Sequence, residues 1–374
     1  MTDHILYLDH MASTPIHPKV KQAVLESLEY IGNPSSHHPY GREIRMKIEE
    51  ARESVASLIH ADPDEIIFTS GATESNALAM NWFKNTQGGI CITSGIEHNS
   101  ILNHSDGVGT VSLSGENIVT PETVKNAINS VNCFGYNNVL VSIGAVNNET
   151  GNIQPLTEAI DAIHSKNAYV LCDASAAINY IPMFVDKINS DYLSASGEKF
   201  GALSGSGFLY ANKNAPFYPL FKGSQEKKRR AGTENVIGII AMGVAAHEIS
   251  YERLAYKASE YNLFVGSLQK ELDKNGIQYL INSDLSAAFT GILNISFKDI
   301  DSAALLYLLS RENIYASAGS ACRSCGEENT TLTTMRVPDN YIKGTIRLSF
   351  GNEPIQIDRV VNSIVNSVLL LKEV

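Results

Sequence analysis

Short apolar runs alternate with longer amphipathic stretches between about residues 40 and 210. The runs are rich in β-branched and aromatic residues and end at turn-forming residues, which is the pattern of buried strands. They occupy residues 65–70, 89–94, 138–144, 168–173, 191–196 and 207–211. Helical patterns separate most of these runs, so the connections are crossovers. The pattern predicts a mainly parallel sheet covered by helices on both faces.

Two amphipathic helices are predicted upstream of the sheet. The first covers residues 17–32, with Pro18 near its start and Gly32 as its stop, and the second covers residues 41–60. Proline suits the first turn of a helix, because the amide hydrogen that it lacks has no partner there. Both helices belong to the same large α/β domain in this interpretation.

The pattern changes after residue 234. A long helical region runs to about residue 275, and short apolar runs then alternate with helices at 300–313 and from about 354. This order predicts a smaller C-terminal α+β domain. The length of 374 residues is consistent with two domains, because a single core of that size is unusual.

Charge and composition narrow the class of function. The formal net charge of -11 argues against a general nucleic-acid surface, which needs a positive footprint. Hydrophobic residues make up 44% and charged residues 18%, and no apolar stretch reaches the roughly 20 residues of a membrane span. The first residues carry no basic segment followed by an apolar run. We therefore expect a cytoplasmic protein without membrane association.

Polar features that suit a phosphate-bearing cofactor follow several of the predicted strands. The turn at 69–75, TSGATES, joins a strand to a helix, and it is either an anion site or an ordinary helix start. Asp173 ends a strand, where it could pair with a protonated ring nitrogen or cap a turn. Lys199 follows another strand in a Ser/Gly-rich loop and could form a Schiff base or be solvated. His98 could stack on a planar ring or lie on a surface loop.

A pair of cysteines, Cys322 and Cys325, lies in a loop flanked by serine and glycine. The adjacent Arg323 would stabilise a thiolate, which makes Cys322 a candidate nucleophile. The spacing also suits zinc or a redox cycle, but no second Cys or His pair at metal-binding spacing accompanies it, so no metal is expected.

The order of these motifs resembles the cysteine desulfurases that serve iron–sulfur cluster assembly and tRNA thiolation. The similarity is nearly full length and rests on YLDHMASTP, GNPSSHHPYG, FTSGATES, the dipeptide EH, VNNETG, CDASA, SGEK, RAGT, SAGSAC and TIRLSFG, between residues 7 and 351. The resemblance implies the fold-type I, class V aminotransferase architecture with a seven-stranded sheet. It implies a large domain at 15–255 and a small domain formed by 1–14 and 256–374.

The resemblance also implies a role for each matching residue. The cofactor would be pyridoxal 5'-phosphate, attached to Lys199, stacked on His98 and paired through its ring nitrogen with Asp173. The phosphate would lie on Ala72, Thr73 and Ser196, and Thr233 would come from the partner subunit of a homodimer. Asn148 and Arg347 would bind the carboxylate of L-cysteine, with Asn148 also lying against the cofactor. Cys322 would take the sulfur as a persulfide and pass it to an acceptor or scaffold protein, leaving alanine.

The chain departs from the family at the cofactor site. Glu198 replaces a histidine that helps to hold the phosphate, so its carboxylate must be protonated, turned away or paired with a cation. Ala176 replaces a glutamine that donates to the ring hydroxyl, a loss of about 0.5–1.5 kcal/mol for which Ser175 could compensate. Cys325 is additional to the family pattern and could resolve the persulfide into a disulfide or be inert.

Three functions are compatible with these residues. The first is a cysteine desulfurase. The second is another pyridoxal-phosphate enzyme, such as a C–S or C–Se lyase, although such enzymes have less need of Cys322. The third is a cofactor-poor scaffold, which Glu198 and Ala176 favour and which the retention of Lys199, Asp173 and Arg347 opposes. The basic run at 227–230 is interpreted as a solvated loop that delivers Arg230 and Thr233 to the dimer.

Overall fold

The computed structural model describes residues 5–104, 110–111, 118–319 and 330–373. The chain divides into two compact units. The large unit comprises residues 14–145 and 154–249, and the small unit comprises residues 1–13, 146–153 and 250–374. Each unit has its own sheet and its own hydrophobic core.

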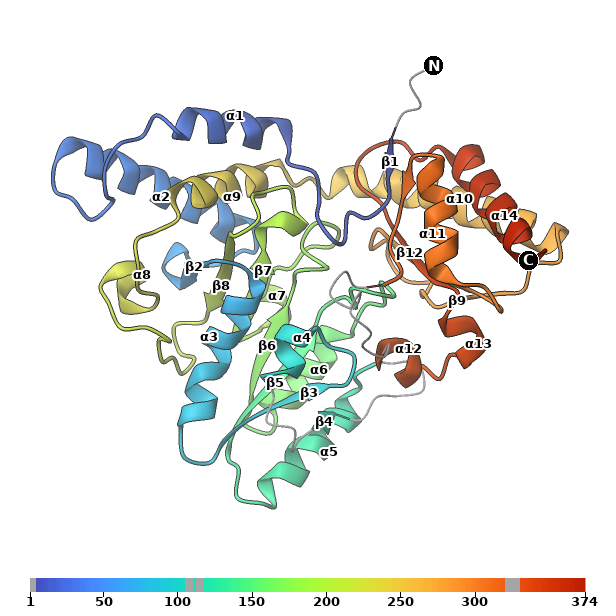
Figure 1. Ribbon diagram of the computed structural model, residues 1–374. Helices are drawn as coiled ribbons and strands as arrows, with labels where there is room; N and C mark the ends of the chain where they lie inside the picture. Colours follow the sequence, from blue (N-terminus) through green and yellow to red (C-terminus); the bar gives the residue numbers. More distant parts are fainter. Residues whose placement is uncertain (1–4, 105–109, 112–117, 320–329, 374) are drawn as a thin grey trace. The chain divides into compact units, whose positions relative to one another are not determined.

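The large unit contains a seven-stranded sheet with the order β2-β8-β7-β6-β5-β3-β4 (Figure 1). The strands are β2 (Ile66–Thr69), β3 (Gly89–Ser94), β4 (Thr110–Val111), β5 (Asn138–Gly144), β6 (Tyr169–Asp173), β7 (Tyr192–Ser196) and β8 (Gly207–Ala211). Strand β8 pairs antiparallel with β2 and β7, and the other neighbouring strands pair parallel. The predicted mainly parallel sheet is confirmed, and the six predicted strands are present with ends that shift by one residue at most. The two-residue β4 is too short to produce a pattern and was not predicted.

Several helices complete the large unit. They are α1 (Pro18–Ser27), α2 (Pro39–Leu58), α3 (Ala72–Asn85), α4 (Asn99–Leu102), α5 (Pro121–Asn132), α6 (Leu156–His164), α7 (Val185–Ile188), α8 (Gln225–Lys228) and α9 (Val236–Glu248), with 3-10 turns at Pro63–Glu65 and Gly197–Lys199. Helix α3 packs on β3, β7 and β8, and α9 packs on α1 and α2. Fully buried side chains such as Phe83, Leu171 and Leu209 form a core between α3 and the sheet.

The first helix is shorter than its pattern predicts. It ends at Ser27 rather than near Gly32, and the Ser27 hydroxyl donates to the carbonyl of Val24. A serine that bonds back to the preceding turn competes with continuation of the helix. The predicted helical region after residue 234 is present as α9 and α10 (Glu252–Lys274), with extended backbone at Ile249 between them.

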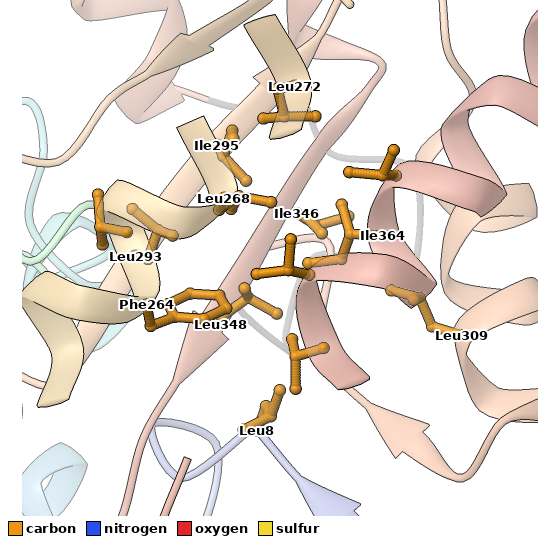
Figure 2. Close-up of a cluster of buried hydrophobic side chains, with 14 of the residues drawn as sticks. Leu8, Phe264, Leu268, Leu272, Leu293, Ile295, Leu309, Ile346, Leu348 and Ile364 are labelled. Atoms are coloured by element: carbon orange, nitrogen blue, oxygen red, sulfur yellow. The ribbon is translucent and has the colours of Figure 1, made fainter. Parts of the chain in front are cut away.

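The small unit is an α+β structure, as predicted. Its strands are β1 (Leu6–Tyr7), β9 (Tyr279–Ile281), β10 (Ile292–Phe297), β11 (Ile314–Tyr315) and β12 (Thr345–Ser349), and its other helices are α11 (Ser302–Arg311), α12 (Thr330–Thr334), α13 (Asp339–Ile342) and α14 (Ile357–Lys372). Strands β12, β10 and β9 form an antiparallel sheet, and β1 pairs parallel with β11. Figure 2 shows the core between this sheet and its helices, where Phe264, Leu348 and Ile364 are fully or almost fully buried.

Candidate active site

The carboxyl ends of four parallel strands lie at one edge of the large sheet. Strands β3, β5, β6 and β7 are consecutive parallel neighbours in the sheet. They end at Ser94, Gly144, Asp173 and Ser196, so the segments that follow them emerge at the same edge. In open α/β sheets this edge is where ligands bind. The topology therefore brings His98, Asp173 and Lys199 to one edge from three separate parts of the chain.

Asp173 is held rigidly at the end of β6. Its side chain is 9% exposed, and Oδ1 accepts a hydrogen bond from the backbone amide of Ser175 at 2.9 Å. Oδ2 accepts another from the side-chain nitrogen of Asn76 at 3.0 Å. These two hydrogen bonds fix the orientation of the carboxylate at the strand end.

His98 begins the short helix α4 and is partly exposed. Its Nδ1 accepts from the backbone amide of Ser100 at 3.1 Å and lies 2.9 Å from the Ser100 hydroxyl. That hydroxyl in turn lies 3.0 Å from the side-chain nitrogen of Asn76. The structure thus links His98 and Asp173 through two side chains that the sequence analysis did not single out. The signal for Asn76 was a polar residue within the apolar pattern of the helix after TSGATES.

Lys199 lies in the 3-10 turn that follows β7, and its side chain is partly exposed. Its carbonyl accepts a hydrogen bond from the Thr14 hydroxyl at 2.9 Å, and the Thr14 amide donates to the carbonyl of Glu198 at 2.8 Å. Thr14 therefore fixes the backbone of the lysine loop.

The turn before α3 has a backbone geometry that suits an anion. Gly71 has a φ of 152° and caps α3 without a side-chain hydrogen bond, so the first amides of the helix are not satisfied by a capping side chain. A Cβ on Gly207 would lie 2.5 Å from the Cα of Gly71, so the absence of a side chain permits this close approach. Ala72 is partly exposed and Thr73 is exposed in the first turn of the helix.

Glu198 changes the chemistry of this turn. The Ser196 hydroxyl lies 2.8 Å from both carboxylate oxygens of Glu198 and donates its hydrogen to that group. The same hydroxyl lies 3.2 Å from the position that a Cβ on Gly71 would occupy. Among the residues that the structure describes, the Glu198 carboxylate has no cation partner, and it faces Ser196 instead of turning away from it. It engages the hydroxyl that the family uses to hold the phosphate.

Glu97 is a second buried carboxyl group at this edge. Its Oε1 lies 2.5 Å from the Ser94 hydroxyl, and Oε2 accepts from the Gly144 amide at 2.7 Å. The pKa of Glu97 is raised to about 7, chiefly by burial. The charge of Asp173 adds to the rise, and these two hydrogen bonds oppose it. Glu97 bridges the ends of β3 and β5 directly before His98, so it fixes the start of the histidine loop.

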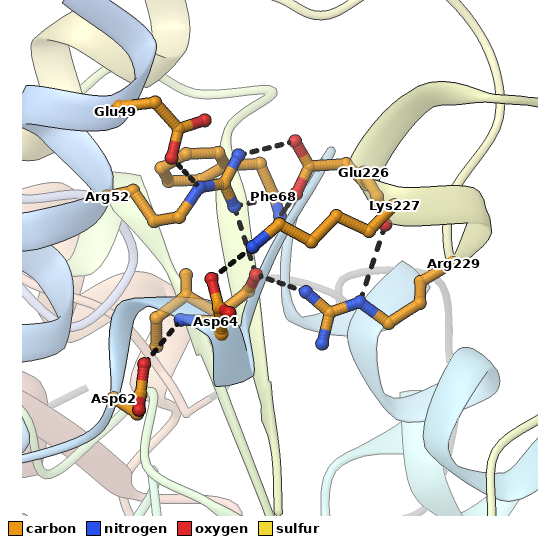
Figure 3. Close-up of polar contacts among 9 residues, drawn as sticks. Glu49, Arg52, Asp62, Asp64, Phe68, Glu226, Lys227 and Arg229 are labelled. Atoms are coloured by element: carbon orange, nitrogen blue, oxygen red, sulfur yellow. Dashed lines mark hydrogen bonds and ion pairs between the residues drawn. The ribbon is translucent and has the colours of Figure 1, made fainter. Parts of the chain in front are cut away.

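Side chains of the basic run at 227–230 form ion pairs and hydrogen bonds with other residues of the same chain (Figure 3). Arg52 is buried and places its guanidinium 2.8 and 2.9 Å from the two oxygens of the buried Glu226 carboxylate. Burial lowers the pKa of Arg52, but the hydrogen bonds and charge of Glu226 outweigh it, and the pKa stands above its ordinary value. Lys227 pairs with Asp64, and Arg229 donates to the Ile66 carbonyl at 3.1 Å. These contacts join the loop to β2 and α2.

Arg230, the last residue of the basic run, contacts the start of α3. Arg230 pairs with Glu74 in the first turn of α3, with 2.7 Å between Nε and Oε1. Glu74 also accepts from the Ser70 amide at 2.8 Å. Thr233, three residues further on, is exposed. Arg230 is therefore held by the large unit of its own chain, and these contacts need no partner subunit.

Asn148 and Arg347 lie together in the small unit. Arg347 is 1% exposed on β12, and one terminal nitrogen donates to the Asn148 carbonyl at 2.9 Å. The other terminal nitrogen lies 2.8 Å from a carboxylate oxygen of Asp9. Asp9 belongs to the YLDH segment of the sequence and was not among the predicted site residues. Its carboxylate pairs with the arginine and helps to fix the plane of the guanidinium.

Cys322, Cys325 and Arg323 lie outside the described residues, as does the rest of 320–329. The described cysteines, at 91, 133 and 172, are not joined by disulfides. Burial raises the pKa of the Cys172 thiol well above its ordinary value, so that residue is unsuited to act as a thiolate.

The residues expected to face the pyridoxal ring fit this cofactor better than the residues expected to hold its phosphate. Ser175 has a buried hydroxyl oxygen with no hydrogen-bond partner in the described structure, and it precedes Ala176, where the family places a donor to the ring hydroxyl. An orphaned buried hydroxyl is costly unless a ligand satisfies it. Asp173, His98 and Ser175 therefore suit the ring, while Ser196 is already bonded to Glu198.

The fold and this strand-end site define an aminotransferase-type α/β protein, and comparison with known proteins refines that class. The family model for class-V aminotransferases matches residues 6–358. The cysteine desulfurase IscS of Dictyoglomus turgidum is 35% identical over 92% of this chain and 89% of its own length. The IscS of Methanosarcina thermophila is also 35% identical, over 95% of this chain and 90% of its own.

Solved structures agree with these sequence relatives. A NifS-like protein superposes with a TM-score of 0.86 at 30% identity, covering 98% of this chain and 100% of its own. A NifS-like protein from Rickettsia africae gives the same TM-score at 28% identity, covering 99% and 100%. The chain belongs to the class-V aminotransferase family and, within it, to the cysteine desulfurases.

Proposed function

We propose that this chain is a pyridoxal-phosphate-dependent cysteine desulfurase, which removes sulfur from L-cysteine and releases L-alanine. The observation that carries the proposal is the meeting of Asp173, His98 and Lys199 at one edge of the parallel sheet in a chain of this family. None of the helices in the described ranges is long and apolar enough to cross a membrane. The sulfur would leave on Cys322 as a persulfide for an acceptor or scaffold protein, as in iron–sulfur cluster assembly or tRNA thiolation.

Each proposed site residue has a chemical task. When bound, pyridoxal phosphate supplies an electron sink for the bonds of the substrate α-carbon. Asp173 would accept a hydrogen bond from the protonated ring nitrogen and so keep that nitrogen protonated. His98 would stack on the ring and move protons, and Lys199 would attach the cofactor and then act as a base. Ala72, Thr73 and Ser196 would border the phosphate, joined by Thr233 of the partner subunit in a homodimer.

The substrate would be held by charge and hydrogen bonds. Arg347 is fixed by Asp9 and Asn148, so its orientation is set before a substrate carboxylate arrives. The Cys322 thiolate would attack the substrate sulfur, so that the bond from sulfur to the β-carbon breaks and a sulfur–sulfur bond forms. Proton return to the carbon skeleton then gives alanine.

The contact between Ser196 and Glu198 favours a second candidate, a cofactor-poor relative that acts as a scaffold. A carboxylate that holds the phosphate-binding hydroxyl opposes a phosphate electrostatically. In this candidate the purified chain would take up no pyridoxal phosphate, and Lys199 would serve no covalent role.

One experiment separates these candidates. We expect the purified protein, supplied with pyridoxal phosphate, to show a visible absorbance band and to convert L-cysteine with a reductant into equal amounts of alanine and sulfide. Lys199→Ala should lose the band, while Cys322→Ala should keep the band and lose persulfide formation. Pyruvate and ammonia as products would indicate a C–S lyase, and no band with added cofactor would indicate the scaffold.

A further inference from the structure

A chain of buried polar side chains joins the two groups that would hold the cofactor ring. Asn76 on α3 is completely buried and lies between Asp173 and Ser100. Its Nδ2 is 3.0 Å from Asp173 Oδ2 and 3.0 Å from Ser100 Oγ. Ser100 in turn contacts His98. Helix α3 therefore holds, with one side chain, residues that follow two different strands.

The hydrogen atoms in this chain can be assigned by counting donors. A side-chain amide has two N–H donors and one carbonyl acceptor. The Oδ1 atom of Asn76 accepts from the Ser194 hydroxyl at 2.6 Å, so Nδ2 is the atom that faces Asp173. A carboxylate cannot donate, so one N–H goes to Asp173 and the other goes to the oxygen of Ser100. All three hydrogen-bonding sites of the amide are then used.

The same count determines where His98 carries its proton. Because Ser100 Oγ accepts from Asn76, its own hydrogen is available for His98 Nδ1, which lies 2.9 Å away. The Ser100 backbone amide donates to the same Nδ1 at 3.1 Å. A nitrogen that receives hydrogens from two donors must present its lone pair. The neutral imidazole is therefore protonated on Nε2.

We propose that Asn76 is a positioning residue that orients the Asp173 carboxylate and, through Ser100, holds His98 in the tautomer with its proton on Nε2. Protonation at Nδ1 would place an N–H against the Ser100 amide and break that hydrogen bond, and the Ser100 hydroxyl would have to accept from Nδ1 instead of donating to it. The ring nitrogen that carries the proton is thereby fixed as Nε2. An aspartate at position 76 would lack both donors and would repel Asp173. The catalytic use of this arrangement rests on the proposed function, whereas the tautomer itself does not.

The tautomer can be measured by nitrogen NMR without cofactor or substrate. Protein labelled with 15N at histidine contains ten such residues, and His98→Gln identifies the resonances of His98. At pH 8 we expect one Nδ1 signal typical of an unprotonated nitrogen and one Nε2 signal typical of a protonated one. Ser100→Ala and Asn76→Ala should each move these signals toward the average of the two tautomers, because Nδ1 then keeps only the backbone amide of residue 100 as a fixed donor.

Ser194→Ala is the matched control. It removes the donor to Asn76 Oδ1 but leaves both N–H donors of Asn76 in place, so the Nε2 tautomer should persist. Pyridoxal-phosphate titration gives an independent readout, and Asn76→Ala should raise the dissociation constant about ten-fold through loss of a hydrogen bond to a charged carboxylate. If Asn76→Ala does not fold, Ser100→Ala in the short helix α4 still tests the tautomer.

Two results would overturn the proposal. One is a wild-type His98 that carries its proton on Nδ1 or exchanges between tautomers, and the other is a Ser100→Ala protein with an unchanged Nε2 pattern. These spectra come from protein without cofactor. They therefore test the tautomer of His98 even if the protein is not a desulfurase. A protein with the Nε2 tautomer but no desulfurase activity would contradict only the proposed function.

Discussion

Glu198 places a negative charge beside Ser196, the hydroxyl that would hold the cofactor phosphate. A phosphate must compete for the hydroxyl hydrogen and also lie near a like charge, whereas the ring of the cofactor meets neither difficulty. The residue therefore affects one end of the ligand and not the other. A comparison of pyridoxal phosphate with pyridoxal separates these two ends.

We expect Glu198→Gln and Glu198→His to lower the dissociation constant of pyridoxal phosphate by about ten-fold or more, because each removes the repulsion. The affinity for pyridoxal, which lacks the phosphate, should stay the same within about two-fold. Both constants are measurable by absorbance titration. An equal gain for both ligands would mean that Glu198 acts on the ring or on the lysine loop rather than on the phosphate.

Glu97 makes the stability of the protein depend on pH. Its pKa is raised to about 7 in the folded state, above the ordinary value of 4.5, so the folded protein binds a proton that the unfolded chain has already lost. The group stabilises the fold fully below pH 4.5, and that contribution is lost as the pH rises toward 7. The decrease is on the order of 3 kcal/mol.

Glu97→Gln should remove this decrease, because the amide does not titrate. The free energy of unfolding, measured with urea at pH 5 and at pH 8, should then differ less in the variant than in the wild type. Glu53→Gln on the exposed side of α2 is the control and should follow the wild type. The idea fails if Glu97→Gln and the wild type lose the same stability between the two pH values.

At the scale of elements, helix α8 depends on a buried ion pair. Three consecutive non-glycine residues, Glu226, Lys227 and Lys228, have left-handed φ values of 46°, 56° and 70°. Such a backbone costs about 1–3 kcal/mol per residue and persists only where surrounding contacts stabilise it. The Glu226 carboxylate supplies those contacts through Arg52 and through the Phe68 amide at 2.9 Å.

Glu226→Gln should therefore lower the free energy of unfolding by about 3–5 kcal/mol, because it leaves the Arg52 charge buried without its partner. Lys227→Ala is the neighbouring control, since its contact with Asp64 is exposed and should contribute no more than about 1 kcal/mol. Chemical denaturation of both variants measures the difference. Similar losses in the two variants would show that the ion pair does not hold the segment.

At the scale of the whole molecule, the proposed dimer shares its active sites between subunits. Thr233 is exposed in a loop that Arg230 anchors to α3 of its own chain, which leaves the threonine available to a second subunit. A site would then combine Lys199 of one chain with Thr233 of the other. Loss of either residue should impair a site. In a mixed dimer of a Thr233 variant and a Lys199 variant, one site lacks both residues and the other site keeps both.

Mixing Thr233→Ala with Lys199→Ala protein should restore activity after subunit exchange. Random pairing makes half of the dimers mixed, and each mixed dimer has one intact site of two, so recovery of about a quarter of wild-type activity is expected. Alanine release by the mixture, against each variant alone, is the measurement. No recovery in a mixture shown to contain mixed dimers would place Thr233 in the site of its own chain.

The strands and most helices followed from the sequence, because burial and helical period depend on residues close together in the chain. The strand-end positions of Asp173, His98 and Lys199 followed for the same reason. The end of α1 at Ser27 did not, because it depends on which of several competing hydrogen bonds the serine makes. Strand β4 did not either, because two residues carry no period.

The sequence by itself therefore determined the fold class, the family and the chemical types of residue at the sheet edge. Only the tertiary structure decided which side chains touch. The contacts of Asn76 with Asp173, of Arg52 with Glu226 and of Arg347 with Asp9 join residues 97, 174 and 338 positions apart. No local pattern encodes such pairs, because they depend on strand order and on the direction of each side chain after the sheet has formed.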